Sequence, residues 1–172
     1  MSMESRGLST EDVAQLQREQ YHHDQRNHGD IACLPKTDRL KHYCLHFAKY
    51  VGRLARADFE VHSMEKTIVD TTLICLSTAN TLHQRLNAMS PTENERTRQI
   101  DMVRPLADAA GRFADACEKI DHLEEFLPIA RSANQDVLAW ALAISEEREL
   151  DLRASIKARR AELSDRQFYI TD

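Results

Sequence analysis

Glycine and proline are scarce in this sequence, with four of each among 172 residues. An all-β protein needs many more of both, because its tight turns depend on their backbone preferences. No apolar run is long enough to cross a bilayer, and the N-terminal segment does not resemble a secretory signal. We therefore expect long helices, a cytoplasmic location and no membrane partner.

The sequence also lacks an excess of basic residues. The net charge is −5, which argues against general nucleic-acid binding, because phosphate backbones require a basic surface. Paired cysteines are absent as well: the four cysteines are widely separated and form no CxxC motif. Three of them lie in apolar helical patterns, where a free thiol behaves as a small hydrophobe. We expect reduced cysteines, with no disulfide or zinc site.

Apolar residues make up 42% of the chain and charged residues 30%, which is ordinary globular composition. From Leu40 to Leu54, apolar side chains recur every three or four residues, and from Met64 to Leu86 they surround most of a helix. These patterns predict an all-α bundle of five to six helices. We place an N-terminal helical arm and polar connector at residues 1–36 and the bundle domain at 37–172.

Local signals predict where the helices begin and end. The arm starts at Ser9 or Thr10 and runs toward Tyr21, and a polar connector follows from His22 to Pro35. A further helix is expected to begin at Ser90, to kink or restart at Pro105, and to continue to Phe126 with a stop near Pro128. Two more helices are expected from Gln135 to Arg148 and from Leu152 to about Arg166, the last with Asp151 as its cap. The helix from Met64 to Leu86 is apolar on more faces than one hairpin covers, which predicts a homodimer.

The chain also contains an internal similarity. Phe47–Ala57 aligns with Leu106–Ala116, and Asp70–Leu76 aligns with Asp136–Leu142. This pattern is compatible with an internally duplicated helical hairpin, although alanine-rich helices also align by chance. Gly52 and Gly111 occupy equivalent positions, and a glycine within a helix is costly. Both glycines are therefore predicted to mark close helix crossings.

The segments FAKYVGRLARA (Phe47 to Ala57), IVDTTLICLSTANTL (Ile68 to Leu82) and ELDLRASIKARR (Glu149 to Arg160) resemble the MazG-like all-α nucleotide pyrophosphohydrolases. The resemblance implies a helical bundle, usually dimeric or larger, that cleaves nucleoside triphosphates to monophosphate and pyrophosphate. It also implies Mg²⁺ held by a Glu-Glu-x-x-Glu motif on one helix and a Glu-x-x-Asp motif on the next, because hard cations prefer carboxylate oxygens.

The metal-ligand motif is degenerate in this sequence. Lys49, Tyr50 and Arg53 stand where the family has glutamates. On the following helix Asp70 matches the final aspartate, and Thr67 replaces its glutamate partner. Replacing acids with Lys49 and Arg53 makes the site repel cations. The family's usual catalysis is therefore not expected from this segment.

Two other groups of residues are candidates for binding. His46, Lys49, Arg53 and Arg56 lie on a basic helix face that would suit phosphate, although such a face is also typical of a solvated surface. Arg53 and its counterpart Arg112 could instead pair with carboxylates across the bundle. The carboxylates that remain for Mg²⁺ are Asp70, Glu118, Asp121 and Glu125.

A pair of histidines supports a further alternative. His42 and His46 are one helical turn apart and in register to share a metal ion. Three functions therefore stay open. The first is a non-catalytic or weakly active MazG-like dimer that binds a nucleotide or another anion as a regulatory module. The second is a divergent Mg²⁺-dependent pyrophosphohydrolase, and the third is a histidine-metal helical enzyme.

Overall fold

The computed structural model describes residues 7–89 and 101–166, and in these ranges the chain is all-α without strands. Seven α-helices and one short 3₁₀ helix occur there, one α-helix more than the largest predicted number. The predicted helix start at Ser90 lies outside the described residues. The bounds are α1 Thr10–Asn27, α2 Gly29–Ala32, α3 Lys36–Arg56, η1 Ala57–Phe59, α4 Met64–Thr81, α6 Arg104–Asp121, α7 Leu127–Glu147 and α8 Leu152–Ser164.

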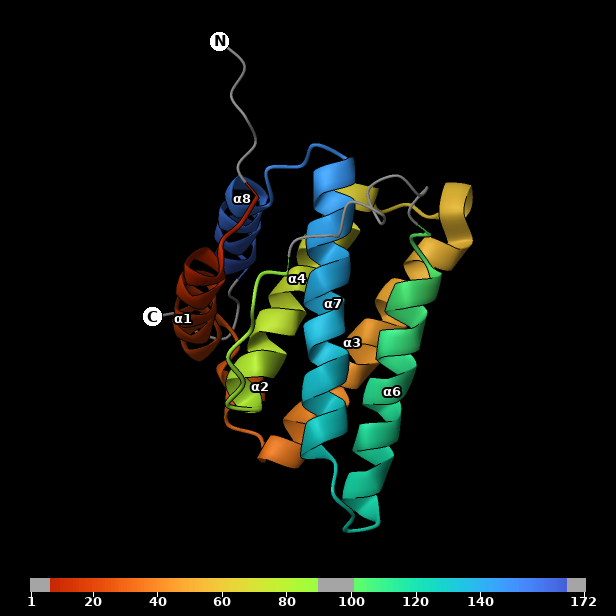
Figure 1. Ribbon diagram of the computed structural model, residues 1–172. Helices are drawn as coiled ribbons and strands as arrows, with labels where there is room; N and C mark the ends of the chain where they lie inside the picture. The colour runs from red at the N-terminus through yellow and green to blue at the C-terminus, as the bar shows by residue number, and fades with distance from the viewer. Residues whose placement is uncertain (1–6, 90–100, 167–172) are drawn as a thin grey trace.

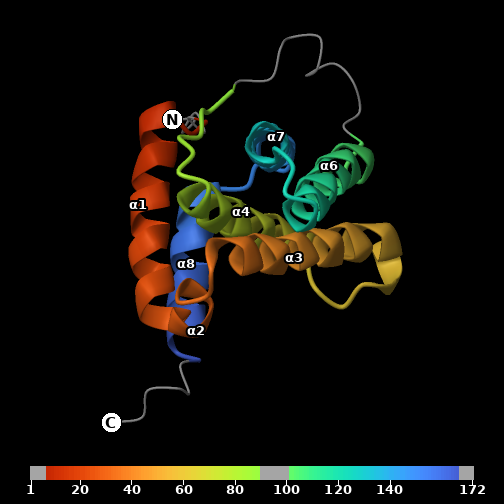
Figure 2. The same ribbon diagram turned by 90° about the horizontal axis from the view of Figure 1, so that it is seen from below.

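Four long helices form the centre of the bundle (Figure 1). Helices α3 and α4 make one antiparallel hairpin, α6 and α7 make a second, and the two hairpins pack side by side through α3 with α6 and α4 with α7. Helices α1 and α8 cover the remaining side of α4, as the view along α7 shows (Figure 2). The bundle is therefore organised around α4.

Helix α4 is buried around nearly its whole circumference. Thirteen of its 18 residues are buried, including the fully enclosed Ile68, Cys75 and Leu76. This confirms the predicted central helix, but α1, α3, α7 and α8 supply the cover within one chain. A homodimer stays a prediction, and an uncovered apolar face of α4 no longer supports it.

The hydrophobic core joins both hairpins. The rings of Phe47 on α3 and Phe113 on α6 meet edge to face, with 5.3 Å between their centroids, and neither side chain is exposed. Such aromatic contacts combine large apolar burial with favourable ring geometry. Val13 and Leu16 of α1 belong to the same core cluster, so the arm packs onto the bundle.

Helix α1 is longer than predicted, since it continues to Asn27 through the first part of the expected connector. Its inner face carries a buried polar stripe at helical spacing: Gln17, Gln20, His23 and Asn27. Gln20 Nε2 donates to Ser77 Oγ on α4 at 3.2 Å, and Asn27 Nδ2 donates to Ser164 Oγ on α8 at 3.0 Å. These hydrogen bonds allow polar side chains to be buried, although His23 Nε2 has no partner among the described residues. An apolar pattern was therefore absent from this buried face.

Burial of His23 gives the fold a pH dependence. Burial, followed by nearby His28 and basic side chains, lowers the pKa of His23 to about 4. An unfolded histidine titrates near 6.5, so between these values the unfolded state binds the extra proton and stability falls as pH falls. We expect His23→Gln to flatten the decline in melting temperature between about pH 7 and about pH 5. The exposed neighbour His22 provides a control, because His22→Gln should show the same change of melting temperature with pH as the parent. The same pH dependence of the melting temperature in all three proteins would show that His23 is not its source.

Two prolines begin helices. Pro105 lies in the first turn of α6, which confirms the predicted restart at this position. Pro128 lies in the first turn of α7, so it does not end the preceding helix as predicted. Helix α6 ends earlier, at Asp121, and Leu123 takes a left-handed conformation with φ 57° in the turn. The predicted cap at Asp151 is confirmed, because its side chain accepts a hydrogen bond from Ala154 N.

The two helical glycines do not mark helix crossings, and this prediction was wrong. Gly111 is exposed, and a Cβ atom there would have nothing within 4 Å. At Gly52 a Cβ atom would meet only the Arg56 side chain of the same helix, at 3.3 Å. Neither glycine is required for close approach of a second helix.

Gly111→Ala is therefore expected to stabilise the protein. Alanine is favoured over glycine in a helix interior by about 0.5–1 kcal/mol, and the structure has room for the added methyl group. Urea unfolding should show this gain as a higher midpoint with an unchanged slope. Gly52→Ala is the matched comparison and should gain less, because Arg56 must move. A destabilised Gly111→Ala variant would refute the prediction.

Candidate functional site

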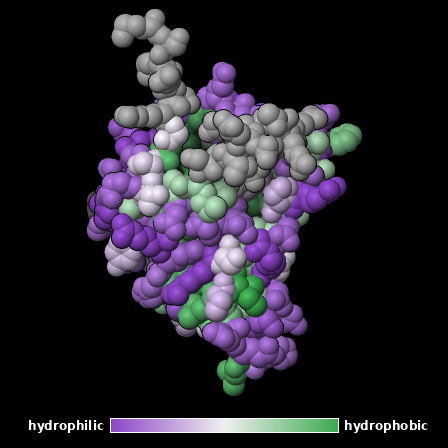
Figure 3. All heavy atoms as spheres, in the orientation of Figure 1, coloured by the Kyte–Doolittle hydropathy of each residue, from purple (hydrophilic) through white to green (hydrophobic). Residues whose placement is uncertain are grey.

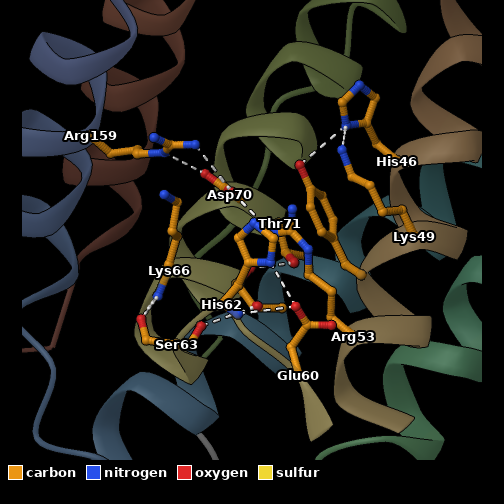
Figure 4. A network of polar contacts seen from close by, with 12 residues as sticks. His46, Lys49, Arg53, Glu60, His62, Ser63, Lys66, Asp70, Thr71 and Arg159 are labelled. Carbon is orange, nitrogen blue, oxygen red and sulfur yellow. Dashed lines mark hydrogen bonds and ion pairs between the residues drawn. The ribbon is translucent and has the colours of Figure 1, made fainter. Parts of the chain in front are cut away.

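The buried carboxylate of Asp70 is the centre of a charged cluster at the α3–α4–α8 junction (Figure 4). Arg159 of α8 donates from Nε to Asp70 Oδ1 at 2.7 Å. From the other side, Arg53 of α3 donates from Nη1 to Asp70 Oδ2 at 3.3 Å. The side chains of all three residues are about nine-tenths buried. Two guanidinium groups thus share a single carboxylate in a poorly solvated position.

This arrangement decides what Asp70 can do. A carboxylate that ligates Mg²⁺ must offer free oxygen lone pairs to the ion. Both oxygens of Asp70 already accept charge-assisted hydrogen bonds, and the surrounding charge is positive. The hydroxyl of Thr67, which stands at the family's glutamate position, donates to the Ser63 carbonyl of its own helix. The structure therefore gives Asp70 the role of counter-ion to Arg53 and Arg159.

The second hairpin contains a matching ion pair. Arg112 on α6 donates to Asp136 on α7 at 2.7 Å, as Arg53 on α3 does to Asp70 on α4. Arg112 also donates from Nε to Asp108 at 2.9 Å. The sequence comparison aligned Arg53 with Arg112 and Asp70 with Asp136. The structure thus shows Arg53 and Arg112 paired with carboxylates of a neighbouring helix, which is one of the roles that the sequence allowed for them.

A line of hydrogen bonds runs along α3 beside this cluster. The ammonium of Lys49 lies 3.1 Å from His46 Nδ1, and the Tyr50 hydroxyl lies 3.2 Å from the same atom. Because an ammonium only donates, Nδ1 accepts and His46 carries its proton on Nε2. That Nε2 lies 3.1 Å from His42 Nε2, which therefore accepts. Burial is the main cause that lowers the pKa of both histidines, that of His46 to about 4.

This tautomer does not favour metal binding by His42 and His46. A ligating nitrogen must offer a lone pair, and in the observed arrangement His46 Nε2 is a donor. Among the residues that the structure describes, no group of three or more His, Cys, Asp or Glu side chains is arranged to hold a metal ion.

The predicted acidic ligands do not come together. Asp121 pairs with Lys41 near the start of α3, whereas Asp70 pairs with Arg53 near its end. Lys41 and Arg53 are twelve residues apart, which corresponds to about 18 Å along a helix. Glu118 faces His122 one turn away, at 3.9 Å, and Glu125 is exposed. Mg²⁺ binding by these residues stays a prediction that the observed placement does not support.

The predicted basic residues divide into two groups. His46, Lys49 and Arg53 lie together, beside the Tyr50 ring: the Lys49 and Arg53 cations lie 5.0 and 5.3 Å from its centroid. Arg56 turns away and donates from Nε to Glu60 Oε2 at 2.8 Å. Hydrogen bonds from His62, together with Arg56, lower the pKa of Glu60 to about 2. Arg56 therefore belongs to a separate ion pair.

Positive charge predominates around Asp70. Lys49, Arg53, Arg159 and Lys66 lie near it, and among the described residues Asp70 and Glu162 are the carboxylates that pair with these cations. Within the described part of the chain, no carboxylate lies within ion-pair distance of the exposed Lys49. Partial burial and the nearby positive charge of Arg53 lower the pKa of Lys49. The positive charge of the Lys49 ammonium is therefore not fully balanced by nearby carboxylates. The site can therefore attract an anion.

Sequence reasoning missed Arg159, although a signal for it existed. Leu152 and Ile156 are buried on α8, and Arg159 continues their stripe at helical spacing. A charged residue within an apolar stripe indicates a buried ion pair.

A groove with a volume of about 590 Å³ lies between α1 and the end of α4. Arg18, Tyr21, His22 and Arg85 line it together with amide side chains. Those amides hold the chain together: Gln17 Nε2 donates to Gln84 O at 2.9 Å, and Asn80 Nδ2 donates to Gln17 O at 2.9 Å. The groove is open, which is unlike the enclosed pockets that bind small molecules.

Comparison of the chain with protein-family models, with curated proteins and with solved structures gave no match. In the described ranges, none of the helices has both the length and the apolar character that a membrane crossing requires.

Proposed function

We propose that this protein is a non-catalytic MazG-like helical protein that acts as a binding or regulatory module for a phosphate-bearing ligand such as a nucleotide. One observation carries the proposal: Asp70, the acid that matches the family's metal-ligand motif, is held by Arg53 and Arg159. A metal ion would have to displace both guanidinium groups from a buried carboxylate. An anion requires no such change, because the site already has excess positive charge.

Lys49 is the residue proposed to contact the ligand. Its ammonium is exposed and has His46 and Tyr50 as neighbours, whereas Arg53 is committed to Asp70. A phosphate at Lys49 would also lie near the Arg53 and Arg159 charges, which attract it without leaving Asp70. Lys49 is therefore proposed to contact the phosphate directly, and Arg53 and Arg159 to attract it through their positive charge.

An internal duplication is part of the same proposal. The hairpins α3–α4 and α6–α7 both join an arginine of the first helix to an aspartate of the second, at positions that align in the sequence. Chance similarity of alanine-rich helices would not by itself give the same pair of partners. Beside its ion pair, helix α3 also carries Lys49, which contacts His46 and Tyr50 but forms no ion pair to a described residue. The first hairpin is therefore the one proposed to bind ligand.

Substitution of Lys49 tests the proposal. A hydrogen bond to a charged group contributes about 1.5–3 kcal/mol, so Lys49→Ala should weaken nucleotide binding about tenfold or more. The melting temperature should stay near that of the parent, because Lys49 is exposed and makes no ion pair to a described residue. Calorimetric titration with nucleoside triphosphates measures the affinity. Lys157→Ala is the control, since Lys157 is an exposed lysine on α8.

The outcomes separate the alternatives. No nucleotide binding by the parent protein would end the phosphate proposal. Release of pyrophosphate from a nucleoside triphosphate with Mg²⁺ or Mn²⁺ would instead favour the divergent pyrophosphohydrolase. Activity that depends on added Zn²⁺ and is lost in His42→Ala would favour the histidine-metal enzyme. The proposed homodimer is tested by light scattering at micromolar concentration, where a salt-independent monomer would refute it.

A further inference from the structure

Two side-chain contacts fix how α3 and α6 lie against each other. Phe47 on α3 meets Phe113 on α6, and Lys41 on α3 pairs with Asp121 on α6. The order along α3 is the reverse of the order along α6, so the two helices run antiparallel. Both contacts lie on the shared face, which sets the register of every residue between them.

Between these contacts, each helix carries one cysteine on the same face. Cys44 is three residues from Phe47 toward Lys41, and Cys117 is four residues from Phe113 toward Asp121. In an antiparallel pair this places the two thiols opposite each other, one turn from the aromatic contact. Each thiol is the first cause of the shift in the pKa of the other, which agrees with this placement.

We propose that Cys44 and Cys117 form a reactive dithiol that low-molecular-weight disulfides oxidise to an intramolecular disulfide joining α3 to α6. The other two cysteines have no such partner: Cys33 is exposed and Cys75 is fully buried on α4. The dithiol lies on the α3–α6 side of the bundle and involves none of the groups that hold Asp70. It is therefore independent of the proposed ligand site.

The exposure of the two thiols assigns the order of reaction. Cys44 is half-buried, whereas Cys117 is only 7% exposed. The neighbouring Cys117 thiol favours the Cys44 thiolate and lowers the pKa of Cys44 to about 7, whereas the Cys44 side chain, together with burial, raises the pKa of Cys117. Thiolates are the attacking species in thiol–disulfide exchange. Cys44 is thus the first nucleophile, and Cys117 resolves the mixed disulfide.

The exchange has two steps. The Cys44 thiolate attacks one sulfur of the reagent RSSR, forms the Cys44–SR bond and releases RS⁻. Cys117 then loses its proton to solvent and attacks Cys44 Sγ, which forms the Cys44–Cys117 bond and releases the second RS⁻. Two protein thiols are oxidised, and the reagent disulfide is reduced to two thiols. No metal or further oxidant is needed.

Peptide mapping of the full chain after treatment with glutathione disulfide tests the proposal. Free thiols are alkylated before digestion, and mass spectrometry should find Cys44 and Cys117 peptides joined with the loss of two hydrogens. The exposed Cys33 should carry glutathione, which shows that the reagent was active. If Cys33 is fully modified while Cys44 and Cys117 both stay alkylatable, or each carries its own glutathione, the dithiol does not exist.

A variant tests the order of attack. In Cys117→Ser the resolving thiol is gone, so Cys44 should accumulate as a stable mixed disulfide with glutathione. In Cys44→Ser, Cys117 should stay unmodified because it is buried. Modification of Cys117 in the latter variant, with Cys44 unreactive in the former, would overturn the assigned order.

Discussion

Replacement of Asp70 with alanine is expected to destabilise the protein by about 3–5 kcal/mol. The substitution leaves Arg53 and Arg159 with side chains 11% and 12% exposed and without their shared carboxylate. Arg53 then has no carboxylate partner among the described residues, whereas Arg159 keeps its ion pair with Glu162 at 2.8 Å. A poorly solvated charge that loses its partner is costly, because neither water nor a carboxylate stabilises it. Chemical unfolding with the linear extrapolation should report the loss directly.

Two further variants test the cause of that loss. Asp121→Ala removes a carboxylate of α6 from its more exposed ion pair with Lys41 of α3, and should cost only about 0–1 kcal/mol. A triple variant, Asp70→Leu with Arg53→Met and Arg159→Leu, removes all three buried charges and should recover much of the stability lost in Asp70→Ala. If the triple variant is as unstable as the single one, unpaired charge is not the explanation.

Phe113→Ala is expected to cost about 3–5 kcal/mol, because the ring is fully buried and packs edge to face on Phe47. For a chain of this size that loss corresponds to a melting temperature lower by about 6–20 °C. The removed ring leaves a cavity between α3 and α6 that these helices cannot close fully, because each also packs against the other helix of its hairpin. Differential scanning calorimetry measures both the midpoint and the enthalpy.

A second phenylalanine serves as the matched control. Phe59 is 89% exposed in η1, so Phe59→Ala should leave the melting temperature almost unchanged. On the face shown in Figure 3, hydrophilic residues predominate and hydrophobic residues form small separate groups between them. Equal losses in Phe59→Ala and Phe113→Ala would show that the α3–α6 contact does not stabilise the fold.

Periodicity predicted the helices whose inner faces are apolar. The spacing of Leu40, Phe47 and Leu54 gave α3, and the continuous apolar pattern from Ile68 gave the central α4. The same method failed for the second half of α1, where Gln20, His23 and Asn27 are buried by hydrogen bonding. Hydrophobic patterns detect burial driven by apolar area, and they do not detect a polar face whose partners lie on distant helices.

The candidate site shows the same division. The sequence indicated that Lys49 and Arg53 occupy positions where the resembling family has acids, and it offered both a phosphate contact and an ion pair for Arg53. Only the packing of α3, α4 and α8 selected the ion pair, by bringing Arg159 to Asp70 across 89 residues of chain. The prediction that Gly52 and Gly111 mark helix crossings failed for a related reason, because the low helix propensity of glycine does not tell what lies beside the helix.

The sequence by itself determined an all-α protein, the central position of α4 and the residue types available for anion or metal chemistry. These properties follow from local periodicity and composition, which act along one chain segment at a time. The tertiary structure alone decided which side chains meet: Asp70 with two arginines, Asp121 with Lys41, and Cys44 with Cys117. Such contacts depend on the register between helices that are distant in sequence, and core packing sets that register.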